Sequence, residues 1–173
     1  KLFGEYGQTV GQLLITRSDI ENLERRTNLI NTFEKLFEYG AIPIINENDS
    51  VAVEEIVYGD NDNLSANVAK LIGADALIIL TDIDGLFSAN PHEDENAVLI
   101  PCVEKITQEI FDLAAPSSSK LGTGGMITKL QAAKLATEAG IDTAVINGTD
   151  PDDIYKLIDG RQIGTFFKGQ AQD

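Results

Sequence analysis

The sequence predicts an α/β protein with an open, mostly parallel sheet between layers of helices. Apolar runs of strand length alternate along the chain with longer segments in which apolar residues recur every three or four positions. That alternation is typical of parallel sheets connected by helices. Residues 76–80 are apolar throughout, as expected for a strand covered on both faces.

In the first part of the chain we expect a strand at 13–15, a helix over 18–39 and a strand at 41–45. Ser18 and Glu21 have the spacing of a capping box, with Asn22 as a rival N-cap, and Gly40 is placed to end the helix. Pro43 argues against a central position for the second strand, because it cannot donate a ladder hydrogen bond. Residues 51–57 alternate weakly and suggest a flap or hairpin.

A helix over 64–71 follows, with Asp62 or Asn63 as its cap and its end near Gly73. Gly140 marks the end of a later helix. The remaining predicted elements are a strand at 76–80, helices at 107–115 and 128–139, a strand at 143–146, a helix at 152–158 and a strand at 164–167.

Composition fits one soluble protein of one or at most two domains, since 173 residues with 43% hydrophobic content can bury a core. No apolar run is long enough to span a membrane. The single cysteine, Cys102, excludes an internal disulfide, disfavours zinc and is consistent with reducing cytosol. The net charge of −15 argues against nucleic acid or an anionic membrane as the partner.

Three polar clusters follow predicted strands, at 46–50, 81–85 and 147–150. Ligands of open α/β sheets bind at the carboxyl ends of the strands. We therefore expect these clusters to share one cleft.

A glycine-rich stretch, Leu121-Gly122-Thr123-Gly124-Gly125-Met126-Ile127-Thr128-Lys129, leads into the predicted helix at 128–139. Bare backbone N–H groups and a helix amino end favour phosphate, and Lys129 is placed to meet its oxygens. Gly124 and Gly125 are expected where a Cβ would block either the backbone conformation or close approach of phosphate. The spacing is not that of a P-loop, and a turn that only packs the helix onto the sheet is the alternative.

A second signal is the run Gly59-Asp60-Asn61-Asp62-Asn63-Leu64-Ser65-Ala66. A helix cap would need only one of its carboxylates and amides. A calcium loop does not fit, because Leu64 and Leu71 stand where oxygen ligands are required. The remaining side chains suit either the ammonium group of an amino acid or the orientation of lysines around a transferring phosphoryl group.

These motifs, together with Ile45-Asn46-Glu47-Asn48-Asp49 and Leu80-Thr81-Asp82-Ile83-Asp84-Gly85-Leu86, resemble the amino-acid kinase family and, within it, the glutamate 5-kinases. The resemblance runs from about residue 8 to 167. It implies an amino-acid kinase (carbamate kinase-like) fold and ATP-dependent phosphorylation of the γ-carboxylate of L-glutamate, with Mg2+, at the start of proline biosynthesis.

The resemblance also implies roles for individual residues. Asp49, Asn61 and Asn46 would bind glutamate, and Asp62 would organise the reacting groups. Lys129 would neutralise charge on the phosphoryl group. The nucleotide would contact Thr81, Asp82, Thr123, Gly124, Gly125, Met126, Ile127, Thr128 and Lys129. No protein metal ligands are expected, because phosphate oxygens and water would hold most of the Mg2+ shell.

The family pattern further leads us to expect an N-terminally truncated chain without a PUA domain, in which residues 1–72 end the acceptor lobe and 73–173 form the nucleotide lobe. Such a chain would be nearly inactive alone. A cytoplasmic homo-oligomer, with proline as a candidate feedback inhibitor, is also implied. The alternatives are another small-molecule kinase of the family, for acetylglutamate or uridylate, and a catalytically silent module that binds nucleotide or amino acid.

Overall fold

The structure is a computed structural model that describes residues 2–49, 61–91, 93–114 and 125–171. The contact pattern divides the chain into two compact units, residues 1–64 and residues 65–173. Each unit is described by itself. The flap expected at 51–57 lies outside the described residues.

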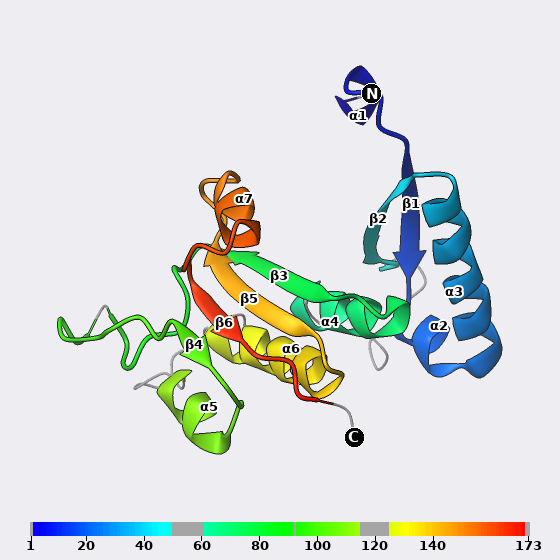
Figure 1. Ribbon diagram of the computed structural model, residues 1–173. Coiled ribbons are helices and arrows are strands. Elements are labelled where there is room, and N and C mark those ends of the chain that lie inside the picture. The colour runs from blue at the N-terminus through cyan, green and yellow to red at the C-terminus, as the bar shows by residue number, and fades with distance from the viewer. Residues whose placement is uncertain (1, 50–60, 92, 115–124, 172–173) are drawn as a thin grey trace. The chain divides into compact units, whose positions relative to one another are not determined.

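The first unit is a βαβ arrangement (Figure 1). Its two strands are parallel and in register from the Val10–Ile42 pair to the Ile15–Glu47 pair. Phe33 is buried and stacks on Phe37, with ring centroids 6.2 Å apart. The elements are α1 (Leu2–Glu5), β1 (Val10–Ile15), α2 (Arg17–Glu21), α3 (Leu23–Glu38) and β2 (Ile42–Glu47).

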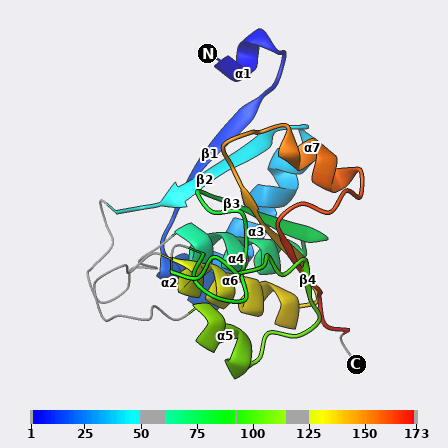
Figure 2. The same cartoon turned by 90° about the vertical axis from the view of Figure 1, so that its left-hand side faces the viewer.

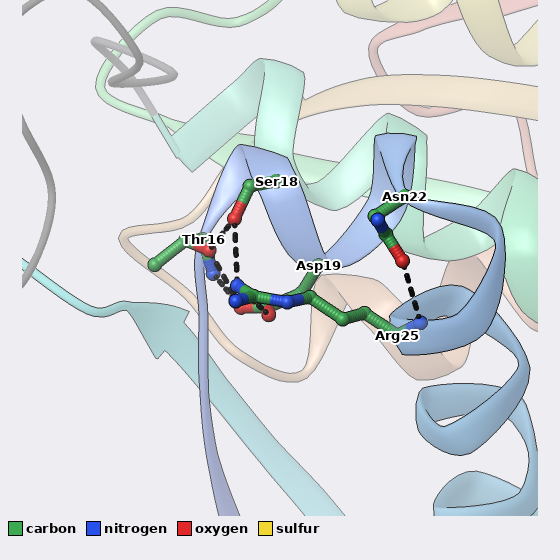
Figure 3. Close-up of polar contacts among 5 residues, drawn as sticks. All are labelled: Thr16, Ser18, Asp19, Asn22 and Arg25. Carbon is green, nitrogen blue, oxygen red and sulfur yellow. Dashed lines mark hydrogen bonds and ion pairs between the residues drawn. The ribbon is translucent and has the colours of Figure 1, made fainter.

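The single helix predicted over 18–39 is in fact two helices separated at Asn22. The proposed Ser18–Glu21 capping box is wrong, because α2 begins one residue earlier with Thr16 as its N-cap. The Asp19 carboxylate accepts hydrogen bonds from the Thr16 backbone N–H at 2.8 Å and the Thr16 hydroxyl at 2.6 Å (Figure 3). Asn22 caps α3, accepting from the Arg25 backbone N–H at 3.1 Å, so the rival cap is confirmed.

The second unit contains a four-stranded sheet in the order β3-β5-β6-β4. β3 and β5 are parallel, as are β4 and β6, while β5 and β6 are antiparallel. Most pairs are parallel, so the predicted sheet type is confirmed. The elements are α4 (Asn61–Ile72), which crosses the unit boundary, β3 (Ala76–Thr81), β4 (Cys102–Val103), α5 (Gln108–Ala114), α6 (Met126–Glu138), β5 (Asp142–Asn147), α7 (Asp153–Ile158) and β6 (Thr165–Phe167).

Helices lie on both faces of this sheet, with α6 on one side and α7 on the other (Figure 2). Ile79 and Val145 belong to the core that includes Leu130 and Ala133 of α6. Neighbouring residues on the strands point the other way, and Ile78 lines a hollow of about 310 Å³ with α7 residues. The sequence predicted that helices cover both faces of the strand at 76–80. This does not hold along the whole of β3, because Leu80 is 47% exposed.

Two helix starts differ from the predictions. α4 begins at Asn61, so Asp62 and Asn63 lie in its first turn and the proposed caps are wrong. α6 begins at Met126 with Gly125 as its N-cap, two residues before the predicted start. The helices do end where glycines were expected to end them, and Gly40, Gly73 and Gly140 all have positive φ.

Candidate functional site

The carboxyl ends of β3 and β5 lie side by side. Thr81 and Asn147 are paired in the parallel register, and each is the last residue of its strand. The backbone N–H of Gly148 donates to the Thr81 carbonyl at 2.7 Å, which keeps the two chains together beyond the strands. The register therefore brings together two of the three polar clusters noted in the sequence.

Side-chain hydrogen bonds link the loops that follow these strands. The Thr81 hydroxyl donates to the Asp82 carboxylate at 3.1 Å. Further along the same loop, Asp84 accepts from the Asn147 side-chain amide, with 2.8 Å between Oδ1 and Nδ2. The amide oxygen of Asn147 in turn accepts from the Thr149 backbone N–H at 2.9 Å. Asp82 and Asp84 are exposed, so the edge of the sheet presents carboxylate oxygens to solvent.

The amino end of α6 lies at the same end of the sheet. α6 packs on β5 and precedes it by three residues, so the helix runs antiparallel to the strand (Figure 1). The Thr128 hydroxyl donates to the Gly125 carbonyl at 3.0 Å within the first turn. Lys129 and Ile127 are half-buried. A helix amino end with a lysine beside carboxyl ends of strands suits an anion such as phosphate.

The structure removes one of the two reasons expected for a glycine at position 125. Its φ is −73°, an ordinary value for any residue, and no atom of the described residues lies within 4 Å of the place where a Cβ would be. The backbone therefore does not require glycine at this position, and only close approach of a ligand remains as a reason. Thr123 and Gly124, also predicted to contact nucleotide, lie outside the described residues.

Charged side chains at the start of α7 form a small network. The Lys156 ammonium contacts the carboxylates of Asp153 at 2.5 Å and Asp150 at 3.3 Å. These hydrogen bonds, that with Asp153 first, raise the pKa of Lys156 above its usual value. The backbone N–H of Asp152, followed by Lys156, lowers the pKa of Asp150. In the cluster at 147–150, the carboxylate of Asp150 is thus paired with the Lys156 ammonium group.

In the first unit, two proposed glutamate contacts lie at the carboxyl end of β2. Asn46 pairs with Leu14 of β1 and is exposed. Asp49 is exposed in the turn beyond the strand. The Asn48 backbone N–H donates to the Ile15 carbonyl at 3.0 Å, which extends the pairing of the two strands toward that turn.

The Thr16–Asp19 hydrogen bonds lie at the neighbouring carboxyl end of β1, where Asp19 is also 3.4 Å from the Arg25 guanidinium (Figure 3). Partial burial disfavours the charged form of Asp19. The Thr16 hydrogen bonds and Arg25 outweigh that effect, so the pKa of Asp19 lies below its ordinary value.

Asn61, the third proposed glutamate contact, and Asp62, proposed to organise the reacting groups, open α4. Asn61 is exposed and Asp62 is half-buried in the first turn. A carboxylate there is stabilised by the helix dipole. The buried side of the helix is formed by Leu64, Ala66, Val68 and Ala69.

Within the described parts of the chain, no three histidine, cysteine or acidic side chains come together to hold a metal ion. None of the helices described there is long and apolar enough to cross a membrane. The hollow of about 310 Å³ opens beside Ala76 and Asp142, at the amino ends of β3 and β5. We place the candidate site at the opposite ends of these strands, because the polar side chains gather there.

Sequence reasoning did not include Asn147 among the site residues, although it noted the 147–150 cluster. The signal that identifies it is its position directly after the predicted strand at 143–146, which makes it the last residue of β5 in the structure. Its hydrogen bond with Asp84 joins residues 63 positions apart and has no local pattern.

Comparisons of this sequence with known proteins agree on one family. Residues 1–147 match the amino acid kinase family. A glutamate 5-kinase of Clostridium acetobutylicum is 52% identical over 167 residues, which are 96% of this chain and 62% of the relative. One from Listeria monocytogenes serovar 1/2a is 50% identical over 100% of this chain and 64% of its own length. The chain thus spans less than two thirds of the length of these curated relatives.

Solved structures agree on the fold. UMP kinase from Bacillus anthracis aligns with a TM-score of 0.64 and 15% identity, over 98% of this chain and 62% of that one. Isopentenyl phosphate kinase from T. acidophilum aligns with a TM-score of 0.63 and 18% identity, over 95% and 62%. With its mostly parallel strand pairs, the polar strand ends and the match over residues 1–147, the chain belongs to the amino acid kinase family.

Proposed function

We propose that the full-length protein containing this chain is a glutamate 5-kinase. It transfers the γ-phosphoryl group of ATP to a γ-carboxylate oxygen of L-glutamate, forming glutamyl 5-phosphate and ADP in the cytoplasm for proline biosynthesis. The observation that carries this proposal is the 52% identity, over 96% of the chain, to a relative of that name. The match takes in nearly the whole chain, so it is not limited to one motif or one unit.

The second unit would bind the nucleotide. Thr81 and Asp82 would line its site, and the 123–129 segment would cover the phosphates. Lys129 begins the second turn of α6, where a cation can neutralise charge on the phosphoryl group as it moves. Phosphoryl transfer depends more on positioning and charge neutralisation than on covalent help from the protein.

The acceptor would be held by Asp49, Asn61 and Asn46, whose oxygens suit the ammonium group of glutamate. Asp62 would organise the reacting groups. Mg2+ would be held mainly by phosphate oxygens and water, and when bound it would neutralise phosphate charge.

The test is turnover by purified full-length protein with ATP, Mg2+ and one acceptor at a time: L-glutamate, N-acetylglutamate or UMP. We expect ADP release that depends on glutamate, together with an acyl phosphate that hydroxylamine traps as a hydroxamate. Turnover with UMP or acetylglutamate alone would identify a different kinase. Nucleotide or amino-acid binding without turnover on any acceptor would identify a silent binding protein.

A further inference from the structure

One side chain joins the two loops at the carboxyl ends of β3 and β5. The Asn147 amide nitrogen donates to Asp84 on the first loop at 2.8 Å. Its amide oxygen accepts from the Thr149 backbone N–H on the second loop at 2.9 Å. Both ends of the amide are therefore used, each on a different loop.

The loop that carries Asp84 has its other fixed point at Leu86. The Leu86 backbone N–H donates to the buried Thr165 hydroxyl at 2.8 Å. Gly85 has a φ of +146°, and a Cβ there would lie 2.7 Å from the Thr165 Oγ1. The turn is thus fixed at the end of β3 and at Leu86. Between these two points, the hydrogen bond from Asn147 fixes Asp84.

We propose that Asn147 is a positioning residue for the nucleotide site, which keeps the Thr81–Asp82 turn in its binding geometry through Asp84. The inference rests on the proposed nucleotide role of Thr81 and Asp82. The direction of the hydrogen bond is essential. Asp84 is a carboxylate and accepts only, so the partner at position 147 must donate.

The proposal predicts coupling between the two positions. Asn147→Asp keeps the shape and the acceptor for Thr149, but it removes the donor and sets a carboxylate against Asp84. Asp84→Asn leaves a hydrogen bond available, because an amide can accept. In the double variant, Asn at 84 donates to Asp at 147, and the hydrogen bond returns in reverse with the wild-type net charge.

The measurement is calorimetric affinity of the full-length protein for ADP and for a non-hydrolysable ATP analogue, alongside the Michaelis constants for ATP and glutamate. For Asn147→Asp we expect about tenfold weaker nucleotide binding and a similar rise in the ATP constant, since the hydrogen bond to a charged group is lost. The glutamate constant should change less than about twofold. Asp84→Asn and the double variant should lie within about threefold of wild type.

A matched control is Asn96→Asp. Asn96 donates to Asp94 at 3.2 Å in the loop that extends from the sheet between Phe87 and Leu99 (Figure 1). This control makes the same change of charge beside an aspartate within the same unit, and it should leave nucleotide affinity unchanged.

Nucleotide affinity within about twofold of wild type in Asn147→Asp would overturn the proposal, as would a double variant no better than that single variant. If Asn147→Asp does not fold, the same comparison with Asn147→Ser, which removes the amide without adding charge, decides the matter. Absence of glutamate turnover in the wild type would overturn the proposal that glutamate is the acceptor. The calorimetric measurement of nucleotide affinity would still test the role of Asn147, because that measurement needs no acceptor.

Discussion

The Thr165 hydroxyl accepts a hydrogen bond from the Leu86 backbone N–H at 2.8 Å and donates one to the Ile100 carbonyl at 2.7 Å. Thr165 is fully buried, so no water is available to replace either bond. One side chain of β6 therefore fixes two segments that are 79 and 65 positions away in sequence.

Thr165→Val should destabilise the protein by about 1–3 kcal/mol, because it leaves a buried donor and a buried acceptor unpaired. Thr165→Ser keeps the hydroxyl and should lose only about 1 kcal/mol for the missing methyl group. Denaturant unfolding of both variants checks the difference. A valine variant as stable as the serine variant would contradict the role of the hydroxyl.

Asp19 should make stability depend on acid pH. Its folded pKa lies below its ordinary value of about 3.9. The protein therefore gains stability from the ionised carboxylate above pH about 4, and loses that stability as pH falls through the folded pKa. The difference in free energy of unfolding between wild type and Asp19→Asn should be largest near pH 6 and shrink below pH about 4. A difference that stays constant over this range would contradict the assignment.

The spacing of apolar residues predicted the helices of this chain, but it did not predict the break at Asn22 within the helix expected over 18–39. The spacing over 18–39 is continuous, whereas the interruption at Asn22 depends on its cap to Arg25 and on Asp19 reaching back to Thr16. The antiparallel pairing of β6 with β5 could not be predicted from the sequence either. The direction of a strand depends on the path of the connection before it, and the residues at 164–167 do not indicate that path.

The site was predictable where it follows from the rule that ligands of open α/β sheets bind at the carboxyl ends of the strands. Thr81 and Asn147 lie together because the parallel register pairs them, and the sequence placed both after strands. The Asn147–Asp84 contact was not predictable, because it depends on the shape of the turn. For Gly125 the sequence left two reasons open, the backbone conformation or close approach of phosphate, and the φ of −73° removes the first.

Lys129→Ala in the full-length protein should lower the turnover number by roughly 100-fold, equivalent to about 3 kcal/mol of transition-state stabilisation. The Michaelis constant for glutamate should change little. Lys134→Ala is the control, because Lys134 lies further along α6 and pairs with Glu138 at the surface. Steady-state ADP release measures both. Turnover within about twofold of wild type would rule out a catalytic role for Lys129.

Asp49→Ala should raise the Michaelis constant for glutamate by roughly tenfold or more, because it removes a charged partner of the ammonium group. The constant for ATP should stay near wild type. Asp75→Ala removes an exposed carboxylate before β3 and should change neither constant. Equal effects of Asp49→Ala on both substrates would indicate a folding defect and exclude a specific acceptor contact.

Gly125→Val separates a phosphate cradle from a packing turn. The far-UV circular dichroism spectrum should match wild type, because φ is −73° and, in the part of the chain that the structure describes, no atom lies within 4 Å of the place where a Cβ would be. Nucleotide affinity should nevertheless fall by roughly tenfold, since the branched side chain would occupy the space that a phosphate needs beside the α6 amino end. Gly4→Val is the matched control, at a glycine that is also open and without positive φ. Calorimetry with ADP measures both variants. If Gly125→Val binds ADP as tightly as Gly4→Val, the segment only packs α6 onto the sheet.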